Sequence, residues 1–190
     1  MTRQTTYLEF DKISILIRKL EKDGEHRFSL LISLGVFLGL RISDLLNLKW
    51  SDIRGKDRFE IVEKKTKKSR ILPINEDLKV IIDNSFTKIG SSSDYIFINR
   101  FGTRTITIQY VNRKLKQIFR KNKLLNGHPI SSHLLRKTFG RNIYLLNNES
   151  EHSLILLSNI FGHSSISITR LYLGLRQEEI LKAYNDIRLL

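Results

Sequence analysis

Residues 39–53 read GLRISDLLNLKWSDI, and this stretch combines the end of one helix, an arginine and the start of another helix. Gly39 follows an apolar segment and should end it, because glycine readily adopts the left-handed conformation that closes helices. A short helix is then predicted through Leu45, Leu46 and Leu48, with Ser43 as a candidate N-cap. Arg41 lies at the mouth of this helix, where free backbone N–H groups and the helix dipole favour an anion. Taken alone, Arg41 is more simply explained as a solvated surface arginine.

Helical periodicity extends over most of the remaining chain. Apolar residues recur at helical spacing over residues 8–20 and 27–38, which predicts two helices. Further helices are predicted over residues 76–86, 107–121, 131–147, 152–160, 165–172 and 177–188. The sequence contains no internal repeat. We therefore expect one mainly helical domain.

A different pattern interrupts the helices between residues 50 and 74. Apolar positions around Ile61 and Ile71 flank a polar, lysine-rich stretch at residues 64–69. This arrangement predicts a β-hairpin with a basic tip. Pro73 places the second strand at an edge or a strand end, because proline cannot donate a ladder hydrogen bond.

The composition points to a polyanionic partner. The chain of 190 residues has 33 Lys and Arg against 19 Asp and Glu, a formal charge of +14. These charges run along the whole chain, which favours nucleic acid ahead of a membrane. The sequence has neither an apolar run long enough for a membrane span nor the apolar stretch of a signal peptide, so we expect a cytoplasmic, DNA-associated protein. The absence of cysteine excludes disulfides, thiolate nucleophiles and cysteine-based zinc sites.

Four polar residues in the second half of the chain are candidate site residues. His133 and Arg136 are three positions apart, so on a helix they share a face and could hold one phosphate. His163 follows a glycine in a predicted turn, and Tyr172 ends the helix that comes next. Considered singly, the first pair is explained by a cap and a surface charge, and Tyr172 by a half-buried packing residue. The chain also contains Tyr7, Tyr95, Tyr110, Tyr144 and Tyr184.

The order and spacing of these residues resemble the catalytic domain of tyrosine recombinases, the phage integrase family. That family's first box begins with glycine-leucine-arginine-isoleucine and ends with tryptophan-serine-aspartate-isoleucine, as residues 39–53 do. Its second box, H-x-x-R, matches residues 133–136. Its third box, a glycine-histidine pair with a tyrosine nine residues after the histidine, matches residues 162–172. The family's hairpin lysine lies eight residues before a strand-ending proline, which assigns it to Lys65 before Pro73, although Lys64, Lys67 and Lys68 lie in the same tip.

The resemblance covers roughly residues 7 to 185 and implies a mainly α fold with a small antiparallel three-stranded β-sheet. We expect residues 1–190 to form a single catalytic domain, with its core from about residue 7 to 188 and no N-terminal core-binding domain before it. Two positions depart from the family pattern. Leu134 stands where many relatives have an acidic residue, and Gly140 falls inside a predicted helix, where glycine costs about 1 kcal/mol relative to alanine.

Phosphodiester chemistry explains the choice of residue types. Attack on phosphorus builds negative charge on the non-bridging oxygens, and two guanidiniums can fork onto them, so Arg41 and Arg136 form the expected clamp. A free phenol has a pKa of about 10, so Tyr172 needs its proton removed or its anion stabilised. These properties favour His133 as the general base and His163 as a hydrogen-bond donor to the phosphate.

The resemblance assigns protonation of the departing 5′ oxygen to Lys65 on a mobile hairpin. It implies a 3′-phosphotyrosine intermediate and a free 5′ hydroxyl whose attack reverses the step. No metal or cofactor is expected, because the candidate groups are cationic and two-metal sites gather carboxylates.

The expected partner is double-stranded DNA, bound by a homo-oligomer that is a tetramer in this family. The resemblance also allows accessory DNA-bending proteins as further partners. Ile180, Leu181, Tyr184 and Ile187 form an apolar stripe near the C-terminus, and either the chain's own core or a neighbouring protomer could cover it.

Three other functions fit part of these observations. A type IB topoisomerase shares the chemistry but lets the cut strand swivel. A DNA-binding regulator could retain the fold without turnover, although the intact Arg41, Arg136, His163 and Tyr172 oppose this. A generic basic nucleic-acid binder explains the charge but not the ordered boxes. The sequence therefore favours a site-specific recombinase that integrates, excises or inverts a mobile DNA element.

Overall fold

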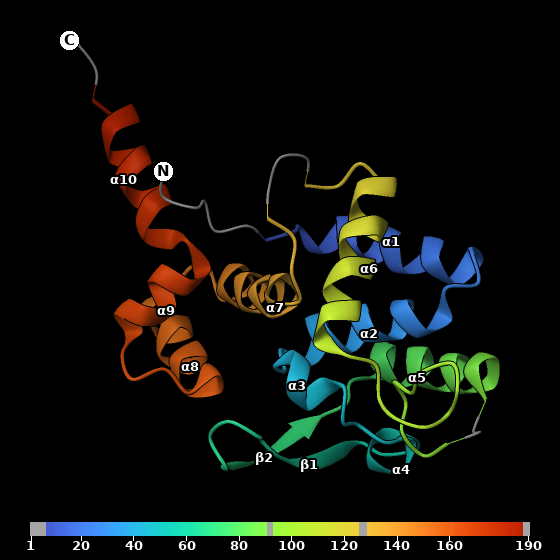
Figure 1. Cartoon of the computed structure of the whole chain (residues 1–190). Helices are drawn as coiled ribbons and strands as arrows, with labels where there is room; N and C mark the ends of the chain where they lie inside the picture. The colour runs from blue at the N-terminus through green and yellow to red at the C-terminus, as the bar shows by residue number, and fades with distance from the viewer. Residues whose placement is uncertain (1–6, 91–92, 126–128, 188–190) are drawn as a thin grey trace.

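The computed structural model describes residues 7–90, 93–125 and 129–187. In these ranges the chain forms mostly helices and one small sheet (Figure 1). The elements are α1 Phe10–Lys22, α2 His26–Leu38, α3 Ile42–Leu45, α4 Trp50–Ile53, β1 Arg58–Val62, β2 Ser69–Pro73, α5 Glu76–Ile89, α6 Ile108–Lys121, α7 His133–Leu146, α8 Glu151–Phe161, α9 Ile166–Leu173 and α10 Leu175–Asn185. None of the described helices is both long and apolar enough to span a bilayer.

Helix α2 lies at the centre of the larger core and packs against α1, α5 and α7 (Figure 1). It is apolar on nearly all sides, which is typical of a helix surrounded by protein. Gly35 allows α7 to approach, because a Cβ at this position would lie 2.8 Å from Leu135 Cδ1. Gly39 ends the helix in the left-handed conformation, with φ 60°, as the sequence predicts. The chain therefore turns sharply just before Arg41.

The first short helix begins earlier than predicted and ends at Leu45 instead of continuing through Leu48. Arg41 has extended backbone angles and is the N-cap of α3, so Ser43 lies inside the helix and its prediction as the N-cap is wrong. A second short helix, α4, follows where no helix was predicted. Its first turn is stabilised by Asp52, whose Oδ2 accepts a hydrogen bond from Lys49 N at 2.9 Å.

Strands β1 and β2 form the predicted antiparallel hairpin, with Val62 opposite Ser69 and Arg58 opposite Pro73. In the described residues the sheet has two strands, so the expected third strand is wrong. The segment after α5 forms only isolated bridges, from Tyr95 to Lys49 and from Ile98 to Thr105. These pairings are too short to extend the sheet.

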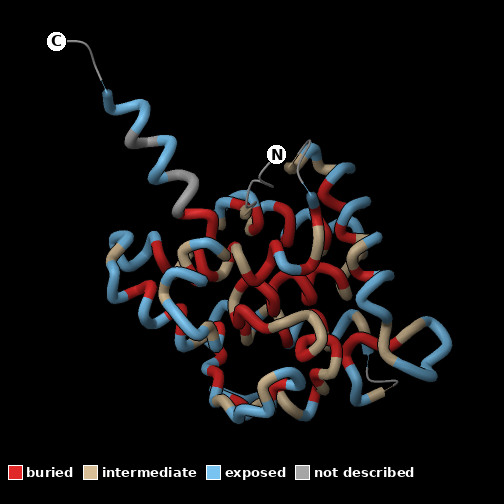
Figure 2. Tube along the Cα trace, turned by 60° about the vertical axis from the view of Figure 1, so that its left-hand side comes forward, coloured by how far each residue is buried: buried red, intermediate tan, exposed pale blue. Residues whose placement is uncertain are grey.

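Helices α7, α8 and α9 form a second, smaller core. Its buried residues are Tyr144, Leu154, Leu157, Phe161, Leu173 and Leu175. Gly140 on α7 makes this packing close, because a Cβ there would lie 2.7 Å from Leu173 and 2.8 Å from Phe161. Gly174 ends α9 in the left-handed conformation, and the described residues of α10 are exposed along most of their length (Figure 2).

Candidate active site

The candidate site lies where four segments meet beside the C-terminal end of α8. The α2–α3 junction contributes Arg41, the hairpin contributes Glu63 and Arg70, α7 contributes Arg136 and α9 contributes Tyr172. These segments are far apart in the sequence. The packing of the two cores brings them together.

The last carbonyl of α8 holds two guanidiniums in place. Phe161 O accepts hydrogen bonds from Arg41 Nη2 at 3.0 Å and from Arg136 Nη2 at 3.1 Å. The final carbonyls of a helix lack partners within the helix and carry the negative end of its dipole, so cations are favoured there. Arg136 Nη1 also donates to Gly39 O at 2.5 Å. The two arginines of the expected clamp therefore point at one oxygen atom.

Arg136 is the more buried of the two arginines. It is 4% exposed, and its guanidinium lies 4.5 Å from the centre of the Phe161 ring. Burial lowers its pKa to about 10. This value is still far above neutral pH, so Arg136 remains a cation.

Glu63 is a residue of the site that the sequence interpretation missed. It is 2% exposed, and its Oε2 accepts hydrogen bonds from Arg41 Nη1 at 2.6 Å and from Thr66 Oγ1 at 2.7 Å. Its Oε1 accepts from Arg70 Nη1 at 3.0 Å, and the same nitrogen donates to Ile160 O at 2.7 Å. Burial alone would raise the pKa of Glu63, but the hydrogen bonds from Thr66 and Arg41 outweigh it and hold the pKa below its ordinary value.

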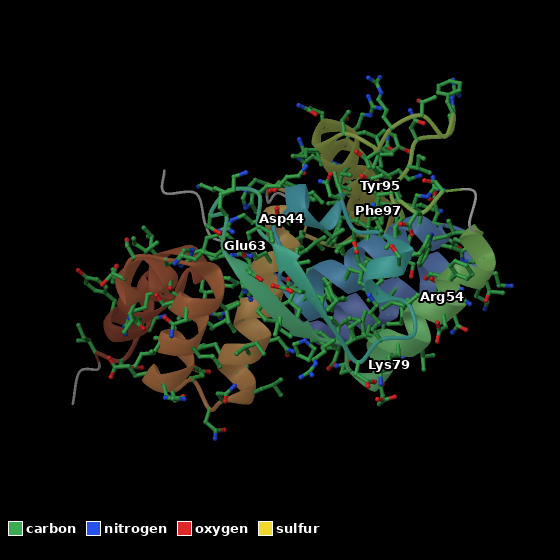
Figure 3. All side chains as sticks on the ribbon, turned by 90° about the horizontal axis from the view of Figure 1, so that it is seen from below. Asp44, Arg54, Glu63, Lys79, Tyr95 and Phe97 are labelled. Carbon is green, nitrogen blue, oxygen red and sulfur yellow. The ribbon has the colours of Figure 1, made fainter. Side chains whose placement is uncertain are left out.

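Figure 3 shows Glu63 beside Asp44, between the hairpin and the helices of the smaller core. The one signal for Glu63 in the sequence is that it is an acidic residue at the edge of a basic hairpin tip. Periodicity gives no reason to connect it with α8.

Tyr172 lies against an aromatic cluster beside the arginines. Its ring centre is 5.4 Å from those of both Phe161 and His163. The phenolic oxygen is buried and has no hydrogen-bond partner among the described residues. Burial raises the pKa of Tyr172 to about 12, and the charges of Arg136 and Arg41 oppose this rise. The phenol is therefore neutral at physiological pH in this structure.

The ring of His163 is held in place through its Nδ1 nitrogen. Nδ1 lies 2.9 Å from the hydroxyl oxygen of Thr169, a fully buried residue. Burial and the cations Arg136 and Arg41 lower the pKa of His163, which favours a neutral imidazole. A donor role for His163 requires Thr169 to donate to Nδ1, so that Nε2 carries the proton.

His133 is the first residue of α7 and is exposed. Partial burial of its ring lowers its pKa, and the nearby charges of Lys137, Arg136 and Arg41 lower it further. Lys137 was not a candidate from the sequence, although it directly follows Arg136. Its ammonium lies 5.2 Å from the centre of the Tyr172 ring.

Lys65 is set apart from the other candidates. It is exposed in the hairpin turn, two residues after Glu63, and has no hydrogen-bond or ion-pair partner within the described parts of the chain. Its lysine neighbours at the tip, Lys64, Lys67 and Lys68, are also exposed. The structure therefore brings Arg41, Arg136, His163 and Tyr172 together, and leaves Lys65 on the adjoining hairpin.

The described residues contain no group of three His, Asp or Glu side chains that could hold a metal ion. The acidic group at the centre of the site, Glu63, is already paired with two arginines.

Residues 6–179 match the phage integrase family. The probable integrase/recombinase YoeC of Bacillus subtilis is 33% identical over 177 residues, which cover 88% of this chain and 93% of that protein. A tyrosine recombinase of Pseudothermotoga lettingae is 31% identical over 160 residues, and XerH of Campylobacter jejuni is 30% identical over 159 residues. These alignments cover 83% and 80% of this chain but 53% and 42% of the relatives, so the chain spans about half their length.

Solved structures share the fold. The crystal structure of XerA recombinase gives a TM-score of 0.72 at 22% identity, covering 100% of this chain and 66% of that one. A post-cleavage complex of XerH with its palindromic difH substrate gives 0.70 at 22% identity, covering 97% of this chain and 54% of that one.

Proposed function

Because the chain belongs to the phage integrase family, we propose that it is a site-specific DNA recombinase that cuts and rejoins strands through a 3′-phosphotyrosine intermediate. The observation that carries this proposal is the convergence of Arg41 and Arg136 on Phe161 O, with Tyr172 packed against the same residue. Two guanidiniums that one carbonyl holds side by side can bind the two non-bridging oxygens of a phosphodiester through their remaining N–H groups. The phenol beside them is then the attacking group.

The reaction proceeds by exchange of one ester for another. Tyr172 Oη attacks phosphorus as the bond from phosphorus to the 5′ oxygen breaks, and His133 takes the phenolic proton. Lys65 gives a proton to the departing 5′ oxygen. His163 donates a hydrogen bond to a non-bridging oxygen, where charge develops. The number of phosphate ester bonds does not change, so the free 5′ hydroxyl of a second strand can reverse the step without ATP, metal or cofactor.

DNA would be bound by the basic surface around this site. Candidate phosphate contacts are Lys49, Arg54, Lys56, Lys114, Lys116, Arg120, Lys121 and Lys123. Some of these cations already have partners: Lys114 pairs with Glu25 at 2.5 Å, and Arg54 stacks on Phe86 at 3.6 Å. We expect such contacts to fix the register of the duplex rather than to read bases.

Assembly on DNA would involve α10. Ile180, Leu181 and Tyr184 are 42%, 47% and 73% exposed, although Leu175 at the start of the helix is buried. These exposures support docking of the apolar stripe on a neighbouring protomer rather than on the chain's own core. A tetramer that holds two duplexes is the proposed active form, and accessory DNA-bending proteins are its proposed additional partners.

The function is tested by trapping the covalent intermediate. Genomic DNA from the source organism is sheared, nicked at random and incubated with the protein, so that cleavage close to a nick releases a short fragment and prevents rejoining. Denatured protein–DNA adducts are then isolated and sequenced. We expect adducts at one recurring sequence with the natural protein and none with Tyr172→Phe. Adducts that persist in Tyr172→Phe would remove Tyr172 from its role, and adducts without a recurring sequence would indicate topoisomerase-like cleavage.

A further inference from the structure

Two hairpin side chains that the proposed chemistry does not use lie inside the arginine cluster. Glu63 and Arg70 flank the turn that carries Lys65, and Glu63 is paired directly with Arg41. Their positions in the middle of the site require an explanation, because a buried carboxylate is costly unless it is fully paired.

The pairing of Glu63 is complete. Its Oε2 accepts from Arg41 and Thr66, and its Oε1 accepts from Arg70. Arg70 in turn donates to Ile160 O at 2.7 Å, next to the Phe161 carbonyl that holds Arg41. The hairpin and the expected phosphate clamp are therefore attached to consecutive carbonyls of α8.

The backbone links Glu63 to the position of the turn. The regular ladder ends at Val62 and Ser69. Beyond it, Glu63 N donates to Lys68 O at 3.0 Å and Lys67 N donates to Glu63 O at 2.9 Å. These two bonds close the turn around Lys65. A hairpin held at Glu63 therefore has its turn held as well.

We propose that Glu63 and Arg70 are positioning residues that dock the hairpin tip on the C-terminal end of α8, so that Lys65 reaches the departing oxygen of the phosphate bound by the clamp. This inference rests on the proposed function. It assigns to Arg70 an effect on leaving-group protonation, whereas a direct phosphate ligand would act on the non-bridging oxygens. The two roles respond differently to the chemistry of the leaving group.

A substrate with sulfur in place of the bridging 5′ oxygen separates these roles. A thiol has a pKa of about 8.5, so it departs as thiolate without receiving a proton. Loss of the general acid should therefore slow cleavage of ordinary DNA and leave cleavage of the sulfur-containing DNA nearly unchanged. Loss of a clamp residue should slow both reactions.

The experiment measures single-turnover cleavage of both substrates at the site identified by adduct sequencing. We expect Arg70→Ala to slow cleavage of ordinary DNA by about 10- to 100-fold, which is less than the rate loss caused by removing a general acid completely. The same variant should cleave sulfur-containing DNA at a rate within about 3-fold of the natural protein's rate. Glu63→Gln should also slow cleavage of ordinary DNA, but because Glu63 pairs with Arg41 as well, it should slow cleavage of the sulfur-containing DNA more than Arg70→Ala does. Lys65→Ala provides the reference for a lost acid, and Arg136→Ala the reference for a lost clamp residue.

Arg70→Lys is the conservative control. Both hydrogen bonds of Arg70 come from the single nitrogen Nη1, and a lysine ammonium can donate to two acceptors. We expect Arg70→Lys to cleave both substrates at close to the natural rate. Glu60→Gln, on the exposed face of β1, should also have no effect.

Equal losses on both substrates in Arg70→Ala would overturn the proposal and make Arg70 a phosphate ligand. Unchanged cleavage of ordinary DNA would overturn it as well, because docking would then not be needed. Should Arg70→Ala unfold, as judged by circular dichroism, Arg70→Gln takes its place in the same comparison. If the natural protein forms no adduct at all, the proposed function itself fails, which is a different result from a natural protein that cleaves and is insensitive to position 70.

Discussion

The surroundings of Tyr172 disfavour ionisation of its phenol, the group that is expected to attack phosphorus. The phenolic oxygen is buried without a partner among the described residues, and burial raises its pKa to about 12. Forming the phenolate in advance at pH 7 would cost ~7 kcal/mol, since each pH unit corresponds to about 1.4 kcal/mol. Transfer of the proton to a base during the attack avoids most of this cost. His133, whose pKa is lowered, is neutral and available at physiological pH.

This reasoning predicts the pH dependence of cleavage. The rate at sub-saturating DNA reports the groups of the free protein. Because burial and neighbouring cations lower the pKa of His133 below 6.5, the rate should fall only below that pH, as the imidazole gains a proton. Between pH 7 and 9 it should stay level, since Tyr172 does not titrate there. A tenfold rise per pH unit over this range would instead show that a preformed phenolate attacks.

The two clamp arginines should not tolerate lysine. Arg41 and Arg136 each use both terminal nitrogens, one of them to reach Phe161 O. Lysine has one nitrogen and cannot reproduce this fork. We expect Arg41→Lys and Arg136→Lys to slow single-turnover cleavage by about 100-fold or more, as loss of a donor to a developing oxyanion does. DNA affinity, measured by filter binding, should change by less than about 5-fold, because the charge is retained. Equal losses in affinity and cleavage would make these arginines ordinary phosphate contacts.

At the scale of elements, Gly140 decides how closely α7 packs against α8 and α9. Alanine is favoured over glycine inside a helix by about 1 kcal/mol. However, a Cβ at position 140 would lie 2.7 Å from Leu173 and 2.8 Å from Phe161, which is closer than atoms in contact can approach. Overpacking a core costs about 1–3 kcal/mol, so the steric effect should exceed the helix propensity.

We therefore expect Gly140→Ala to lower the free energy of unfolding by up to about 2 kcal/mol, the overpacking cost less the gain in helix propensity. Urea denaturation followed by circular dichroism measures this change. Leu146→Ala, at a 70% exposed position of the same helix, should change stability by less than about 0.5 kcal/mol. A Gly140→Ala protein more stable than the natural one would show that α8 and α9 shift outward at little cost.

Local signals account for much of the fold and for only part of the site. Gly39 ends its helix as predicted, because a left-handed residue is a property of a few neighbouring positions. Helix α4 was not predicted, since its four residues show no helical period and the sequence pattern assigns them to the start of the segment that leads into the hairpin. The hairpin was predicted from the apolar segments that flank its polar tip, whereas the third strand was expected only from the family resemblance and is absent from the two-stranded sheet of the described residues.

The same distinction applies to the site. Arg41, Arg136, His163 and Tyr172 could be named because their order and spacing resemble the boxes of the family, and their catalytic roles remain predictions. Arg70 was not predicted, because its hydrogen bond to a carbonyl 90 residues away depends on how the hairpin packs against α8. Local sequence patterns carry no information about such a contact.

At the scale of the whole molecule, α10 extends away from the rest of the chain (Figure 1). Leu175 anchors its first turn in the smaller core, while the apolar side chains further along remain exposed. If a neighbouring protomer covers this stripe in the active assembly, charge placed on it should block assembly but not chemistry within one protomer. Cleavage within one protomer and strand exchange between assembled duplexes can then be measured separately.

We expect the double variant Leu181→Glu, Tyr184→Glu to cleave a single nicked duplex within about 2-fold of the natural rate. Assembly of two duplexes, followed by sedimentation velocity and native gels, should fall by at least about 10-fold, because burying two carboxylates in an apolar interface costs several kcal/mol. Val80→Glu, at a 59% exposed apolar position on α5, controls for added negative charge and should assemble normally. Equal loss of cleavage and assembly in the double variant, together with a lower melting temperature, would indicate that α10 packs on its own core. A double variant that assembles like the natural protein would place the protomer contact on another surface.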